Sequence, residues 1–194
     1  MEKEALKRIF KFLEKKEQQN PPFLWKHINN IPLTEEDLNV KGNLNLAYSS
    51  ITSLPEGLNV RGNLFLYKSK ITLLPKGLKV GGDLDLHNSK ITSLPEGLKV
   101  GGSLYLDYSL IKSLPKGLKV GLNLTLSYTN ITSLPEGLKV GGDLELQDCE
   151  NLKSLPNDLK VRKGLWLSGS PLGRLPDEKI LNMVKPNGYI GQIY

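Results

Sequence analysis

A unit of twenty residues repeats along most of this 194-residue chain, and one clear copy runs from Leu78 to Gly97. The copies begin at regularly spaced leucines: Leu38, Leu58, Leu78, Leu98, Leu118, Leu138 and Leu159. A short, fixed period is typical of a solenoid, in which neighbouring repeats stack and build one continuous core. We therefore predict a mainly β solenoid of about seven coils over residues 38–176, with caps at residues 1–37 and 177–194.

Each copy holds two leucines separated by one residue, as Leu84 and Leu86 are. This spacing is the two-residue period of a strand whose leucines face inward and whose other side chains face outward. Stacking such strands in register, about 4.8 Å apart, gives a parallel sheet on one face. The Leu-Pro-x-Gly step in the rest of the copy disfavours helix, and a second short strand could form at Leu-Lys-Val.

The pattern Leu-x-Leu-x-x-Ser-x-Ile-Thr-x-Leu-Pro, over about residues 38–176, resembles the short leucine-rich repeat of bacterial proteins. Two positions depart from the common form: Ser or Thr replaces the usual Asn, and a valine such as Val80 lies four residues before the strand leucine. Similar arrays occur in bacterial and bacteriophage proteins. Some secreted effectors with Leu-Pro repeats carry a ubiquitin ligase domain after them; because this chain ends shortly after its last copy, we do not expect that activity.

Both ends of the repeat array carry segments that we interpret as caps, because a solenoid exposes its core at each end. At the N-terminal end, apolar residues at helical spacing predict an amphipathic helix from about Glu2 to Glu17: Leu6, Ile9, Phe10 and Leu13. Binding to a membrane surface or to a partner is the alternative role for this helix. At the other end we expect a short helix from Asp177 to Val184, then a turn at Asn187-Gly188 and a closing strand.

The composition indicates a protein of the cytoplasm without a membrane partner. The leucines are separated by polar residues, so no apolar run approaches the roughly 20 residues of a membrane span, and the N-terminus lacks a secretory signal. The single cysteine, Cys149, cannot form an internal disulfide. It also stands in a row of small polar residues after the strand, which we interpret as structural: Ser49, Ser69, Ser89, Ser109, Thr129, Cys149 and Ser170.

The sequence gives no indication of catalysis, a metal or a cofactor. His27 and His87 are the only histidines, and no spacing brings Cys, His or carboxylates together as metal ligands. Asp83 and Asp85 would share a face, but without a pocket they form a poor acid–base pair. Gly81-Gly82 and its copies precede no helix that would cradle a nucleotide, so we interpret them as turns.

Comparing the copies separates a constant scaffold from a varying outer surface, and the varying strand positions are rich in aromatic and acidic residues. Exposed aromatic residues serve as anchors in protein interfaces. The alternative is that they only cover neighbouring strands. We predict that this face binds another protein with a basic surface, through the following residues: Tyr48, Phe65, Tyr67, Asp85, His87, Tyr105, Asp107, Tyr108, Tyr128, Glu145 and Trp166.

A second candidate surface is a row of lysines at one repeat position: Lys79, Lys99, Lys119, Lys139 and Lys160. Such a row could follow the phosphates of a nucleic acid or another polyanion. The overall formal charge of +6 permits this, although 26 basic and 20 acidic side chains make a mixed surface. A sharper hypothesis for the sheet face is that a phage-encoded inhibitor uses it to occupy the basic groove of a host nuclease or defence complex.

Overall fold

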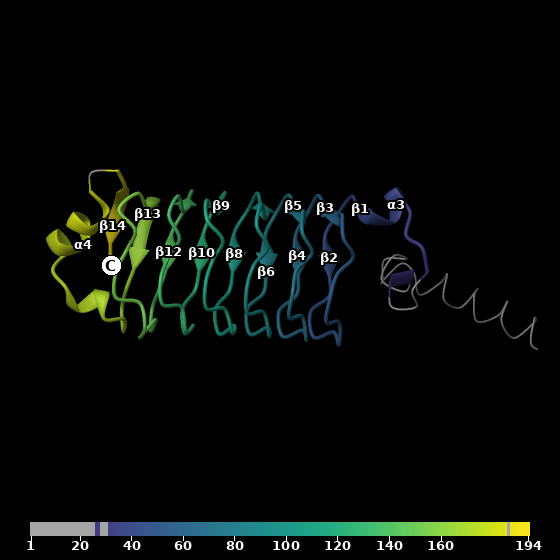
Figure 1. Ribbon diagram of the computed structural model, residues 1–194, viewed down its shortest axis with the longest axis horizontal. Coiled ribbons are helices and arrows are strands. Elements are labelled where there is room, and N and C mark those ends of the chain that lie inside the picture. The colour runs from purple at the N-terminus through teal and green to yellow at the C-terminus, as the bar shows by residue number, and fades with distance from the viewer. Residues whose placement is uncertain (1–25, 28–30, 186) are drawn as a thin grey trace, which may run out of the picture. The chain divides into compact units, whose positions relative to one another are not determined.

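The computed structural model describes residues 26–27, 31–185 and 187–194. Contacts within the chain divide it into two compact units, Met1–Asn39 and Val40–Tyr194. The second unit is a mainly β, parallel-sheet solenoid of about six turns with few helices (Figure 1).

Each of the six turns contributes a pair of two-residue strands separated by a short bend. The pairs, in chain order, are β1 (Asn39–Val40) and β2 (Leu44–Asn45), β3 (Asn59–Val60) and β4 (Leu64–Phe65), β5 (Lys79–Val80) and β6 (Leu84–Asp85), β7 (Lys99–Val100) and β8 (Leu104–Tyr105), β9 (Lys119–Val120) and β10 (Leu124–Thr125), and β11 (Lys139–Val140) and β12 (Leu144–Glu145). The expected second strand at Leu-Lys-Val is therefore confirmed.

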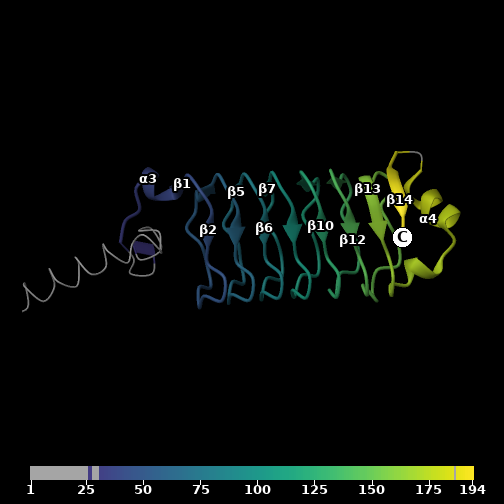
Figure 2. The ribbon, with the colours of Figure 1, turned by 180° about the vertical axis from the view of Figure 1, so that it is seen from behind.

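The strands form two parallel arrays that meet at one longer strand, β13 (Lys160–Trp166). The odd-numbered strands pair with one another, the even-numbered strands do the same, and β13 pairs with both β11 and β12. Each residue faces its equivalent in the next turn, as Leu84 faces Leu104. The predicted in-register parallel sheet is confirmed, and Figure 2 shows the same order of strands from behind.

The core is a column of leucine, isoleucine and valine side chains inside the stack. Leu84 and Leu86 are fully buried, as the two-residue period predicts, and Val80 and Ile91 of the same turn are also buried. Burying one such side chain stabilises the fold by about 1.5–3 kcal/mol. Because every turn supplies the same layer, most of the folding energy is uniform along the stack.

The row of small polar residues after the strand lines the inside of the turn, as expected. Ser69 Oγ donates a hydrogen bond to the Leu66 carbonyl at 2.6 Å, and Thr129 Oγ1 does the same with Leu126. Cys149 lies in this row, and its thiol donates to the Leu126 carbonyl of the preceding turn at 3.2 Å. These side chains thus donate mainly to the backbone carbonyl of the second strand leucine, which forms no bond within the sheet.

A different set of polar side chains joins the bends between the two strands of successive turns, and we call this set the polar row. Its members are Asn43, Asn63, Asp83, Ser103, Asn123 and Asp143. Asn63 Oδ1 accepts the backbone N–H of Asp83 at 2.9 Å, and Asp83 Oδ1 accepts that of Ser103 at 2.7 Å. The carboxylates of Asp83 and Asp143 thus have a structural role, because each accepts a backbone N–H of the next turn.

The turn after each even-numbered strand places one residue in the left-handed region, which L residues other than glycine rarely adopt. The residues are Tyr48, Lys68, Asn88, Tyr108, Tyr128 and Asp148, with φ between 52° and 58°. Gly169 takes the equivalent position with φ 76°. Three tyrosines therefore hold a backbone conformation that costs energy for a bulky side chain.

The C-terminal helix and the strand after it lie where the sequence predicts them, whereas a 3-10 helix before them was not predicted. A 3-10 helix, η1 (Leu172–Arg174), is followed by α4 (Asp177–Val184), whose Ile180 and Val184 are buried. The chain then enters β14 (Tyr189–Ile193), which pairs in parallel with β13 and contacts α4. Figure 1 shows α4 beyond β13, at the C-terminal end of the stack.

In the first unit the structure describes one short helix that the sequence did not indicate, α3 (Glu35–Leu38). Thr34 caps it by accepting the N–H of Asp37, and Lys26 pairs with the Asp37 carboxylate at 2.7 Å. The hydrogen bond from Lys26 is the main reason that the pKa of Asp37 lies below its ordinary value. The helix predicted over 2–17 lies outside the described residues.

Candidate protein-binding site

The sheet face contains a hollow of about 640 Å³ in its later turns. The lining residues come from four successive turns and the turn after β13: Asp85, His87, Tyr105, Asp107, Tyr108, Ser127, Tyr128, Glu145, Gln147, Asp148 and Ser168. Seven of the eleven residues predicted to bind a partner are among them. Asp85, Tyr105 and Glu145 lie on β6, β8 and β12, and the other lining residues follow the strands. The parallel register of the strands places equivalent residues of successive turns side by side.

The hollow forms where small side chains follow large ones at equivalent outward-facing positions of successive turns, which we call a column. The column that carries Tyr67 and His87 in the earlier turns carries Ser127 and Ser168 later. On the neighbouring column, Thr125 lies between Tyr105 and Glu145 in the sheet register and is buried. The reduced side-chain volume over β10 leaves an open hollow that tyrosines and carboxylates border.

Two tyrosines form an aromatic wall of the hollow. The rings of Tyr108 and Tyr128 are stacked with their centroids 4.5 Å apart and an angle of 7° between their planes. Both side chains are nevertheless exposed, at 57% and 52%. Both residues hold the left-handed backbone conformation that recurs in the other turns of the stack.

Three of the four carboxylates in the hollow have a partner within the protein. Asp85 accepts from the ring nitrogen Nδ1 of His87 at 2.7 Å. Asp107 accepts the backbone N–H of Ser127 at 2.8 Å and the hydroxyl of Thr125. A hydrogen bond to Asp148 is the main reason that the pKa of Tyr128 is raised.

Glu145 is the fourth carboxylate, and within the described part of the chain it forms no hydrogen bond or ion pair. Partial burial raises the pKa of Glu145, and the neighbouring charges of Asp107 and Asp143 raise it further. No lysine or arginine of the described ranges lines the hollow. The charge of the Glu145 carboxylate is therefore not offset by a lysine or arginine among the residues that line the hollow.

The other four predicted residues lie outside the hollow. Tyr48 packs edge-on against Tyr67 at 5.1 Å, and Tyr67 stacks on His87 at 5.0 Å, so this part of the aromatic surface leads to the hollow. Phe65 is half-buried on β4. Trp166 stacks on Tyr194 at 4.0 Å, so the C-terminal residue covers one face of its ring.

Four lining residues were not predicted: Ser127, Gln147, Asp148 and Ser168. All four belong to the varying outward columns, which is the signal that could have identified them. Ser127 Oγ donates to Gln147 Oε1 at 2.5 Å, so this pair of lining residues joins the turns of β10 and β12.

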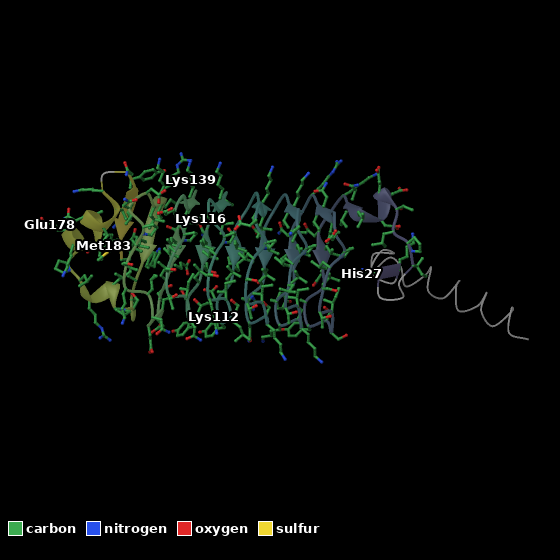
Figure 3. The ribbon with its side chains drawn as sticks, in the orientation of Figure 1. His27, Lys112, Lys116, Lys139, Glu178 and Met183 are labelled. Atoms are coloured by element: carbon green, nitrogen blue, oxygen red, sulfur yellow. The ribbon has the colours of Figure 1, made fainter. Side chains whose placement is uncertain are left out.

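The lysine row is present on the odd-numbered strands. Lys79, Lys99, Lys119, Lys139 and Lys160 face one another in register, and all but the half-buried Lys160 are exposed. None of them forms an ion pair with another described residue. Figure 3 shows Lys139 at the upper edge of the stack, where side-chain nitrogens project from the ribbon. On another surface, Lys116 approaches Glu136 at 3.6 Å, and both are highly exposed.

Groups that could support other chemistry are few in the described residues. No set of three or more His, Cys, Asp or Glu side chains among them is placed to hold a metal ion. Cys149 is buried, and burial raises the pKa of its thiol, which disfavours the reactive thiolate. No helix in the described ranges combines the length and apolar character that crossing a bilayer requires.

No protein-family model and no curated protein matches this chain. The candidate site therefore rests on its own geometry, in which separate turns bring aromatic and acidic side chains to one hollow.

Proposed function

We propose that this chain is a non-catalytic protein-interaction module of the cytoplasm that binds a partner through the aromatic and acidic sheet face. The observation that carries the proposal is the convergence of seven predicted residues on one hollow. Aromatic side chains at its wall offer the large, rigid contact area that protein interfaces use as anchors. Because the sheet holds these side chains in place, binding would require little ordering of the face.

The charges of the hollow favour a partner with a basic surface. Among the residues that the structure describes, four carboxylates line it and no lysine or arginine does. A negative concave surface attracts a positive one, speeds its association and repels phosphates. This electrostatic pattern supports a basic protein over a nucleic acid as the partner of the sheet face.

Three finer features belong to the same proposal. We infer that the array is a leucine-rich repeat of the short bacterial and phage type, with β13 as a seventh coil and with the two ends as caps. The buried Ile180 and Val184 of α4 support the C-terminal cap. We also propose that the partner is the basic groove of a host nuclease or defence complex, which a phage-encoded inhibitor would occupy. The negative hollow supports this choice, because such grooves bind phosphates.

The lysine row supports a second candidate function, the binding of nucleic acid or another polyanion. Its members lie in register at the strand spacing of about 4.8 Å, and no described acidic residue neutralises them. Both features would help a row of lysines to follow a chain of phosphates. The long, flexible lysine side chains offer no shaped recognition surface, which is why we rank this function second.

A pull-down of the tagged chain from bacterial lysate, with and without nuclease, separates the two functions. Binding through the sheet face predicts a protein that is retained after nuclease treatment and lost with Tyr105→Ala. Binding through the lysine row predicts nucleic acid that is released by salt and lost with the double change Lys99→Glu and Lys119→Glu. Retention of nucleic acid alone would contradict the first proposal.

A further inference from the structure

The hollow contains one carboxylate that the fold leaves without a partner. Asp85, Asp107 and Asp148 accept hydrogen bonds from neighbouring residues, whereas Glu145 accepts none from the described residues. From this arrangement we propose that an arginine side chain of the partner enters the hollow, pairs with Glu145 and lies against the stacked rings of Tyr108 and Tyr128. The inference rests on the proposed function and names the group that the site recognises.

A cation is the group that the hollow lacks. A half-buried carboxylate beside other negative charges is unfavourable in the free protein, as the raised pKa of Glu145 reflects. A positive group next to Glu145 would relieve the repulsion from Asp107 and Asp143. The three remaining carboxylates already have donors, so they would add long-range attraction while Glu145 makes the direct contact.

Arginine suits this site better than lysine because of its shape. A guanidinium is planar, can bind a carboxylate through two parallel hydrogen bonds and stacks on aromatic faces. The exposed rings of Tyr108 and Tyr128 offer such faces next to the acidic residues. The volume of about 640 Å³ exceeds what one side chain needs, so flanking residues of the partner would fit as well.

The experiment measures binding of three short peptides to the full chain by NMR titration at low salt. The peptides are acetyl-Gly-Arg-Gly-amide, the same peptide with lysine, and the same peptide with citrulline, which keeps the shape of arginine but is uncharged. We expect the arginine peptide to bind with a dissociation constant in the millimolar range. The lysine peptide should bind at least about threefold more weakly and the citrulline peptide at least about tenfold more weakly.

Two matched variants assign the binding to Glu145. Glu145→Gln should weaken binding of the arginine peptide at least about fivefold, which corresponds to about 1 kcal/mol. Glu136→Gln removes an equal charge from an exposed position outside the hollow and should leave binding unchanged. A thermal unfolding curve for each variant verifies that it is folded. Equal binding of the arginine and citrulline peptides, or equal losses in both variants, would overturn the inference.

The same titration separates failure of this inference from failure of the proposed function. If the arginine peptide does not bind, while a purified partner protein binds and is lost with Tyr105→Ala, the arginine assignment is wrong and the proposed function stands. If the partner also binds the Tyr105→Ala variant with full affinity, the sheet face is not the binding surface and both are wrong.

Discussion

Leu122 stands where other bends of the solenoid carry glycine, and the polar row beside it holds Ser103 in place of asparagine or aspartate. At Gly82, Gly102 and Gly142 an added Cβ would collide with the side-chain oxygen of the polar row in the preceding turn. The member of the polar row at the equivalent position before Leu122 is Ser103, which has the shortest side chain of the row. The serine still bonds to the next turn, because Ser103 Oγ accepts the N–H of Asn123 at 3.3 Å. The two exceptions therefore compensate each other.

Lengthening Ser103 should be harmful only while Leu122 is present. We expect Ser103→Asn to destabilise the protein by about 1–3 kcal/mol, because its amide would overlap the leucine side chain. In a Leu122→Gly background the same change should be neutral or stabilising, since the amide can then make the shorter bond seen elsewhere in the row. Urea unfolding of the four proteins in this double-mutant cycle measures the coupling. Additive effects would contradict the compensation.

Replacing Tyr108 by glycine should change the stability of the protein little but should strongly weaken its binding to the partner protein. Glycine relieves a left-handed backbone that costs about 1–2 kcal/mol for an L side chain, whereas loss of the ring stack costs about 0.5–1.5 kcal/mol. We therefore expect the free energy of unfolding to change by less than about 1 kcal/mol. Leu106→Ala, in the core of the same turn, should cost about 2–5 kcal/mol. A large loss of stability in Tyr108→Gly would show that the ring is structural.

The ionisation of Glu145 should destabilise the free protein, because its pKa is raised in the folded state. The folded protein holds the proton of Glu145 more tightly than the unfolded chain does. The stabilisation that results is fully present below the pKa of Glu145 in the unfolded chain, and it is lost as the pH rises through the pKa of Glu145 in the folded protein. Glu145→Gln should thus raise the free energy of unfolding at about pH 7 and give little gain at about pH 4. Urea unfolding at both pH values tests this, and an equal gain at both would exclude ionisation as the cause.

The thiol of Cys149 should be unreactive in the folded protein. It is buried, and its pKa is raised chiefly by burial. We expect iodoacetamide at about pH 8 to leave the native protein unmodified over an hour but to alkylate the urea-unfolded chain within minutes. Mass spectrometry measures the added group. Rapid alkylation of the native protein would contradict the structural role of this residue.

The repeating elements could be predicted because one physical rule applies in every turn. The two-residue period of Leu84 and Leu86 identifies the strand, and the same register places both leucines inside. The helix at Asp177–Val184 follows from its apolar spacing and from the proline before it. These features depend on residues close together in the sequence.

The bends and the hollow depend on contacts between turns, which sequence patterns do not show. Asp83 looks like a surface charge, and only the neighbouring turn reveals that it accepts an N–H. A tyrosine such as Tyr108 gives no signal for a left-handed backbone, although Gly169 in the same column does. The hollow needs small side chains such as Ser127 to lie between larger ones from other turns.

In the proposed function, the sheet face binds the partner and the lysine row does not. The most direct measurement is calorimetric titration of the purified partner into the wild type, Tyr105→Ala, and the double variant Lys99→Glu and Lys119→Glu. We predict that Tyr105→Ala weakens binding at least about a hundredfold, as expected for an interface anchor, and that the lysine variant binds within about twofold of the wild type. The reverse order of effects would contradict the account.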